Sequence, residues 1–175
     1  DKPIVTEYLL GEVMTVMRKE RVGSNHKNKE RKIRQLIDSD QISDANKIYN
    51  EMAKDPTVPK VMKMLIEAEI LYSRKDYTKA RDVAMECFRQ KGESIITLNL
   101  LGKIFLKLQD QSSALKCFNR ANQLSSKNLY RLCDMAEAES ELGNHDSAKE
   151  HVDAAKGIDK DNERVKNTEA AVAIS

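Results

Sequence analysis

The 175-residue sequence contains no tryptophan, three prolines and six glycines, and aromatic residues make up only 5% of it. A sheet of many strands needs a supply of proline and glycine for its turns, so this scarcity disfavours a β-rich fold. The residues that are abundant instead are charged (33%) and hydrophobic (40%), as in amphipathic helices. The composition therefore predicts an all-α protein.

Cysteine and long apolar segments are also scarce. Cys87, Cys117 and Cys133 form no CxxC pair and lie at no metal-ligand spacing from a histidine. This pattern predicts free thiols in a reducing compartment. No apolar run reaches the roughly 18 residues needed to cross a bilayer, and there is no signal-peptide pattern. We therefore expect a cytoplasmic protein with no membrane-spanning segment.

A strong excess of one charge is missing as well, since the formal net charge is +2. This balance excludes a polycation built for nucleic acid. The charges are nevertheless uneven: residues 18–34 hold eight Lys/Arg against two acids, and residues 134–164 hold ten Asp/Glu against four bases. The basic run has no interleaved aromatic residues for base stacking. We interpret it as a solvated linker rather than a nucleic-acid site.

Motifs for catalysis are absent too. There is no HExxH, no glycine-rich phosphate loop and no GxSxG. His26, His145 and His151 fall in a linker, a turn and a polar helix, where we expect them to be solvated. The sequence predicts a protein that is not an enzyme and uses no cofactor or metal.

What the sequence does contain is a repeat. The segments DSDQISDA, SRKDYTKA, KLQDQSSA and ELGNHDSA end at Ala45, Ala80, Ala114 and Ala148, at spacings of 35, 34 and 34 residues. Each is a polar turn before a helix start, and apolar residues recur at threes and fours on both sides of it. Each unit is therefore a helical hairpin that must stack on its neighbours to bury both apolar faces.

These hairpins resemble the tetratricopeptide repeat (TPR) family over about 135 of the 175 residues. The unit from Ile95 to Asn128 matches seven signature positions of the family: Leu98, Leu101, Gly102, Phe105, Ala114, Phe118 and Ala121. The units from Val61 and Leu129 match fewer, and the unit from about His26 is degenerate. The family's early tryptophan is replaced by Met or Leu. The resemblance implies a right-handed superhelical solenoid, with small residues at Gly102 and Ala114 where the two helices of a hairpin cross closely.

Three regions follow from this interpretation. Residues 1–24 form an N-terminal helix and linker, residues 25–160 form about four TPR-like repeats, and residues 161–175 form a C-terminal capping helix. Such a helix shields the last hairpin of a stack from water. Its expected apolar lining is Val165, Ala170, Val172 and Ile174.

The N-terminal helix allows two interpretations. It runs to about Val22, with an apolar stripe of Val5, Leu9, Leu10, Val13, Val16 and Met17, and it either packs on the first repeat or belongs to another domain. Lys2-Pro3 followed by such a helix resembles the end of a response-regulator receiver domain. That resemblance implies a phosphate-sensing Lys2 positioned by Pro3, in a fragment without its phosphoacceptor aspartate.

The family resemblance also places a partner-binding groove on the first helix of each hairpin. Its positions here are Met62, Leu65, Glu69, Tyr72, Asn99, Lys103, Leu106, Lys107, Tyr130, Cys133, Glu137 and Glu141. This mixed set suits a peptide or partner helix with apolar anchors and both signs of charge. The C-terminal carboxylate clamp of one TPR subclass is disfavoured, because Glu69 and Glu137 stand where it needs cations or amides.

The predicted function is a non-catalytic protein-protein interaction module, acting as the output region of a two-component response regulator in phosphorelay signalling. The alternative is a free-standing TPR scaffold or co-chaperone for assembly, unrelated to phosphorelay. A third expectation is a homodimer formed through the exposed stripe of Leu9, Val13 and Met17 on the N-terminal helix.

Overall fold

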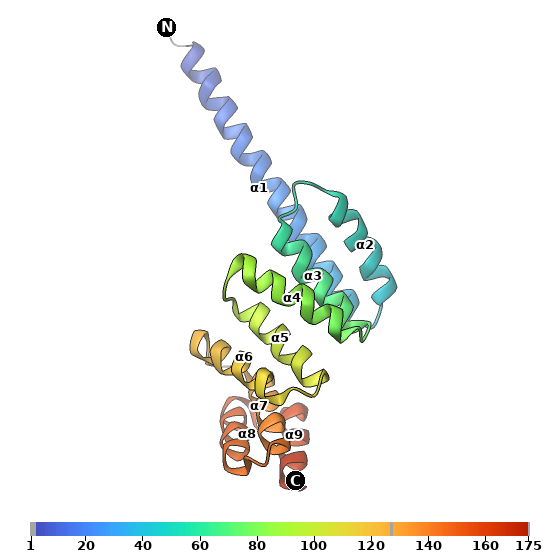
Figure 1. The fold of residues 1–175 in the computed structure, drawn as a ribbon. Helices are drawn as coiled ribbons and strands as arrows, with labels where there is room; N and C mark the ends of the chain where they lie inside the picture. The colour runs from blue at the N-terminus through green and yellow to red at the C-terminus, as the bar shows by residue number, and fades with distance from the viewer. Residues whose placement is uncertain (1–2, 127, 175) are drawn as a thin grey trace. The chain divides into compact units, whose positions relative to one another are not determined.

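The computed structural model describes residues 3–126 and 128–174, with side chains placed at Glu12 and from Met14 onward. Within this part of the chain the secondary structure is helical, without a strand (Figure 1). The helices are α1 (Pro3–Asp38), α2 (Ile42–Lys54), α3 (Lys60–Ser73), α4 (Tyr77–Lys91), α5 (Ile95–Lys107), α6 (Gln111–Leu124), α7 (Leu129–Glu141), α8 (His145–Asp159) and α9 (Glu163–Ile174). They form two compact units, Asp1–Arg74 and Lys75–Ser175.

The first unit is built on one continuous helix, α1, where the sequence predicted a helix ending near Val22 and then a linker. The linker prediction is wrong. Residues 23–38 contain no proline and many Lys, Arg, Glu and Gln, which are good helix formers, and a glycine such as Gly23 costs only about 1 kcal/mol. The C-terminal half of α1 also buries Ile33 and Leu36 in a core with residues of α2 and α3. Figure 1 shows its N-terminal half extending beyond α2 and α3.

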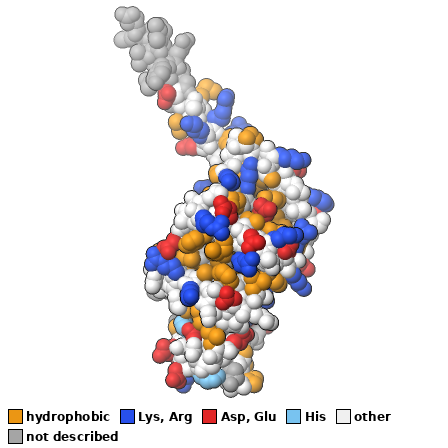
Figure 2. Space-filling view, in the orientation of Figure 1, with side chains coloured by type: hydrophobic (Ala, Val, Ile, Leu, Met, Phe, Trp, Pro, Cys, Tyr) orange, Lys and Arg blue, Asp and Glu red, His pale blue; other side chains and the backbone are white. Residues whose placement is uncertain are grey.

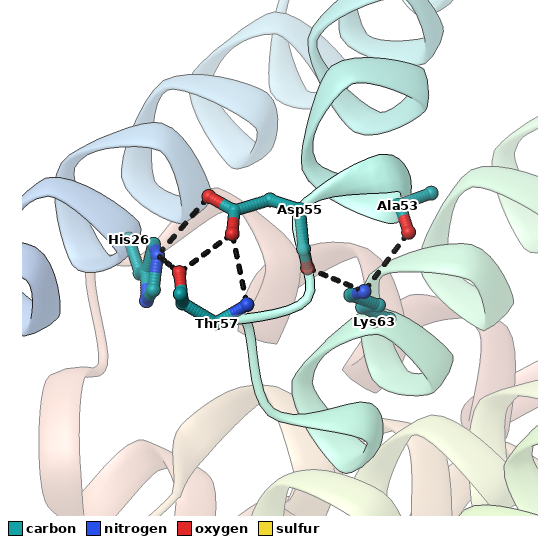
Figure 3. A network of polar contacts seen from close by, with 5 residues as sticks. All are labelled: His26, Ala53, Asp55, Thr57 and Lys63. Atoms are coloured by element: carbon teal, nitrogen blue, oxygen red, sulfur yellow. Dashed lines mark hydrogen bonds and ion pairs between the residues drawn. The ribbon is translucent and has the colours of Figure 1, made fainter.

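A polar network ties α1 to the loop between α2 and α3 (Figure 3). His26 is only 5% exposed, so the expectation of a solvated linker histidine is wrong. Its Nε2 lies 3.1 Å from Thr57 Oγ1 and 3.6 Å from Asp55 Oδ2. Lys63 Nζ donates to the carbonyl oxygens of Ala53 (2.9 Å) and Asp55 (2.7 Å). The partners of His26 are about thirty residues away in sequence, so no local sequence pattern indicates that His26 will be buried.

The second unit contains the hairpins α5/α6 and α7/α8, with α4 packed on α5. Its repeat alanines, Ala80, Ala114 and Ala148, are completely buried, as is Ala45 in the first unit. Gly102 lies against Phe118: a Cβ atom on Gly102 would be 2.3 Å from Phe118 Cε1. The close crossing that the TPR resemblance implied at this position is therefore present.

The predicted capping helix is α9, which packs on α7 and α8. Its buried residues are Val165 and Thr168, whereas Ala170 is exposed and Ile174 is 87% exposed. The expected lining was therefore right for Val165 and wrong for Ala170 and Ile174. Thr168 replaces an apolar residue because its hydroxyl donates to Glu137 Oε1 at 3.0 Å, which satisfies it in the buried position.

The three cysteines are free, as the sequence predicted. Cys87 and Cys133 are buried, and Cys117 is half-buried. Burial and the nearby Asp110 carboxylate raise the pKa of the Cys117 thiol to about 11. A thiol with so high a pKa is a poor nucleophile at neutral pH, which fits a packing role.

The predicted receiver-type pair falls at the edge of the described chain. Lys2 lies outside the described residues, and Pro3 is the first residue of α1. Proline is favoured at the first position of a helix, because its missing N–H would have no partner there. Its position in α1 therefore has a local explanation.

Candidate partner-binding surface

The predicted groove residues of the first unit lie on α3. Met62, Leu65, Glu69 and Tyr72 are all half-buried. Met62 packs against the core of the unit. Glu69 accepts three hydrogen bonds from Arg34 of α1, two from Nε at 3.1 and 3.3 Å and one from Nη2 at 3.2 Å. Burial raises the pKa of Glu69, and the Arg34 guanidinium opposes this effect. Glu69 is thus already bound by α1.

On α5, the predicted residues divide between core and solvent. Lys103 and Lys107 are exposed. Leu106 packs against the cluster of Ala114, Phe118 and Met135. Asn99 is half-buried, and its side-chain oxygen accepts a hydrogen bond from Arg131 Nη1 at 3.1 Å. Of the predicted groove residues on this helix, the two lysines are therefore the ones that remain open to a partner.

On α7, Tyr130 is 58% exposed, and Glu141 is exposed as well. Cys133, by contrast, is completely buried. Glu137 accepts from Arg164 at 2.9 Å, and Glu141 accepts from Gln111 Nε2. Tyr130 thus offers a free aromatic side chain, while the two acids are already held by other helices of the same unit.

Two arginines matter here that the sequence did not single out. Arg164 of α9 lies 2.8 Å from Asp134 and 2.9 Å from Glu137 and so binds two acids of α7. Arg131 of α7 is only 2% exposed. An arginine beside an apolar stripe gives no signal in a single sequence that it will be buried, because its partners come from other helices.

Arg131 connects α7 to α5 and α6. Its Nε donates to Asn122 Oδ1 at 2.5 Å, its Nη1 donates to Asn99, and its Nη2 donates to the carbonyl oxygen of Ser125. All of these acceptors are neutral, and no ion pair of Arg131 occurs within residues 3–126 and 128–174. Burial lowers its pKa, but a guanidinium keeps its charge in proteins.

A cavity of about 140 Å³ opens beside this arginine. It is lined by Asn99, Lys103, Phe118, Asn128, Tyr130, Arg131 and Asp134. Burial raises the pKa of Asp134, and Arg164 and Lys103 oppose the shift. Two cations and one acid thus line a small polar cavity between α5 and α7.

The wider surface carries charges of both signs. Figure 2 shows Lys/Arg and Asp/Glu side chains interspersed with hydrophobic ones on the visible face. The described residues include no group of three or more His, Cys, Asp or Glu side chains placed to hold a metal ion. None of the helices described is both long and apolar enough to cross a membrane.

Comparison with protein families gives one match that covers most of the chain. The model of the family described as ChAPs (Chs5p-Arf1p-binding proteins) matches residues 27–175. No curated protein matches the chain.

Solved structures with the same fold are TPR-like proteins of low sequence identity. MamA (AMB-1) is 14% identical with a TM-score of 0.65, and the match covers 86% of this chain and 81% of MamA. A tetratricopeptide repeat protein from Parabacteroides merdae is 15% identical with a TM-score of 0.64, over 84% of this chain and 58% of that one. The Sgt2 TPR domain from Aspergillus fumigatus is 16% identical with a TM-score of 0.60, over 67% of this chain and 79% of that one. The fold is therefore all-α and of the TPR-like solenoid class.

Proposed function

The chain belongs to the ChAPs (Chs5p-Arf1p-binding proteins) family, and from this premise we propose that it is a non-catalytic scaffold that binds protein partners. The family description names two partners, Chs5p and Arf1p. We propose that proteins of these two kinds are the partners to test first. This proposal corresponds to the scaffold alternative of the sequence analysis.

The observation that carries the proposal is the exposed face of α5 and α7. Lys103, Lys107 and Tyr130 are exposed on helices that bury residues such as Leu101 and Leu132 on another face. Exposed cations and a tyrosine above a rigid helical layer suit recognition of another protein, because tyrosine adds apolar area and lysines add charge selectivity. The partner would lie along this face of the second unit.

A role as the output region of a response regulator has weaker support. The family match begins at residue 27 and covers none of the residues that carried the receiver resemblance. The structural matches concern helical-repeat proteins. Lys2 and Pro3 as a phosphate-sensing pair stay a prediction from sequence alone.

The proposed function is tested by direct binding. Purified Chs5p and Arf1p are titrated separately onto the immobilised chain, onto the double variant Lys103→Glu/Lys107→Glu, and onto the control Lys116→Glu/Lys149→Glu. The control changes the net charge equally but on α6 and α8, where both lysines are also exposed. We expect at least one partner to bind, with the first variant weakened about tenfold or more and the control unchanged. If neither Chs5p nor Arf1p binds, the proposal is contradicted.

We also propose self-association through α1. Of the predicted stripe, the side chains of Leu9 and Val13 lie outside the described residues, and Met17 is 62% exposed. Met14 and Val16 nearby are 66% and 51% exposed, and exposed apolar side chains favour burial against another surface. In sedimentation equilibrium, we expect the wild-type chain to associate and Met17→Glu to be monomeric. Asn25→Glu, an exposed control on the same helix, should associate like wild type. A monomeric wild type at high micromolar concentration would rule the dimer out.

A further inference from the structure

We propose that the cavity between α5 and α7 is a binding site for an oxyanion, a carboxylate or a phosphoryl group carried by the partner segment. The site is centred on Arg131 and Lys103. The inference deepens the proposed function, on which it rests, by naming the chemical group that the exposed face of α5 and α7 recognises.

Arg131 carries a charge that no acidic side chain among the described residues pairs with. A buried cation without a counter-ion is costly, because neutral oxygens replace only part of its lost hydration. Arg131 is 2% exposed and makes hydrogen bonds to Asn122, Asn99 and Ser125, none of which carries a charge. A bound anion would supply the charge that these acceptors lack.

The Arg131 guanidinium has more N–H donors than its described hydrogen bonds use. A guanidinium has five N–H donors, and Nε, Nη1 and Nη2 of Arg131 each make one described bond to another side chain or to a carbonyl oxygen. One N–H on each of Nη1 and Nη2 is therefore left over, and Arg131 itself lines the cavity. Paired guanidinium donors match the oxygens of carboxylate and phosphate groups.

The cavity also has a charge and a size that suit a small oxyanion group. Lys103 adds a second cation to the lining, and Tyr130 adds a hydroxyl. Asp134 is the only acid among the lining residues described, and it lies 2.8 Å from Arg164, which offsets its charge. A volume of about 140 Å³ equals the share of four or five water molecules at roughly 30 Å³ each. An oxyanion group fits, with the rest of the partner outside.

This site differs from the carboxylate clamp that the sequence disfavoured. Glu137, which argued against a bound carboxylate, is paired with Arg164 and Thr168 of α9. Its negative charge is therefore largely offset within the unit.

The test is titration of the full chain with inorganic phosphate or with acetate at constant ionic strength, set by chloride. The readout is the NMR signal of the Arg131 Nε–H group and of the Tyr130 ring. We expect saturable shifts at both residues, and the anion that binds more tightly identifies whether the natural group is phosphoryl or carboxylate. Shifts that grow linearly without saturation would overturn the proposal.

Variants separate the site from general charge effects. Lys103→Gln should weaken anion binding about threefold or more, while Lys107→Gln, an exposed lysine on the same helix that does not line the cavity, should leave it unchanged. Equal effects of both variants would overturn the proposal. Because Arg131 is buried, Arg131→Lys is interpreted only where its circular dichroism matches wild type, and it should then abolish the saturable shift of the Tyr130 ring.

The same variants distinguish this inference from the proposed function. If Chs5p or Arf1p binds wild type and Lys103→Gln equally well, the oxyanion site fails as a partner contact while the scaffold function stands. If phosphate or acetate binds saturably but neither protein does, the scaffold function fails and the anion site stands.

Discussion

At the scale of single residues, Gly102 packs closely against Phe118 in the second unit. The phenylalanine is completely buried, and its ring occupies the place of a Gly102 side chain. The TPR resemblance indicated this position from sequence, because a glycine in a helix interior costs about 1 kcal/mol and needs a packing reason. Arg131 is the opposite case, since its burial depends on Asn99, Asn122 and Ser125, which a single sequence does not connect to it.

Gly102→Ala tests this contact. The new Cβ would be 2.3 Å from Phe118 Cε1, so the ring or the helix would have to shift. We expect the free energy of unfolding to fall by about 2–3 kcal/mol, measured by urea denaturation. The double variant Gly102→Ala/Phe118→Leu should lose less than the sum of the two single variants, because leucine removes the clashing atoms. Strict additivity would show that the ring is not the cause.

At the scale of elements, the hairpin turns share one backbone feature. Asp40, Lys75, Gln109 and Gly143 have positive φ angles of 58°, 64°, 59° and 80°, and they follow the spacing of the repeat alanines. This left-handed residue ends the first helix of a hairpin and starts the turn. The repeat was predictable because such turns recur with the alanines, although only Gly143 is the residue type that favours the conformation.

Gly143→Ala isolates the cost of this turn. Nothing lies within 4 Å of a Cβ at Gly143, so the effect comes from its φ of 80° alone. We expect a loss of about 1 kcal/mol in the free energy of unfolding. The matched control is Gly157→Ala in α8, which also has nothing within 4 Å and should gain about 0.5–1 kcal/mol, as alanine does within a helix. A gain of stability at both positions would contradict the assigned turn.

Helix ends were less predictable than helix spacing. Of the four repeat turns, one has a side-chain cap among the hydrogen bonds described, from Ser113 N to Asp110 Oδ1 at 3.0 Å. The caps at Ser94 and Asn128 lie instead at the starts of α5 and α7. The length of α1 was missed for a related reason: a polar, charged stretch predicts solvent exposure, but it is equally compatible with a helix that buries only one narrow face.

At the scale of the whole molecule, each unit has its own apolar core and its own long-range polar contacts. Ile33, Met52 and Ile66 are buried in the first unit, and Arg34–Glu69 joins α1 to α3. In the second unit, Arg131 and Arg164 join α7 to its neighbours. The all-α hairpin architecture was predictable because small residues recur in the sequence at the spacing of the repeat. The ion pairs of the groove acids Glu69 and Glu137 were not predictable, because their partners Arg34 and Arg164 come from other helices.

We propose that the exposed side of α5 and α7 contacts a protein partner, and site-specific photo-cross-linking tests this contact. The cross-linker p-benzoylphenylalanine is introduced in place of Tyr130, or in place of Ile158 on α8 as a control that is 46% exposed. Each chain is irradiated with purified Chs5p or Arf1p. We expect a cross-linked product from position 130 and none from position 158. Products from position 158 alone would contradict this proposal, because the partner would then contact α8 instead of the face that carries Tyr130.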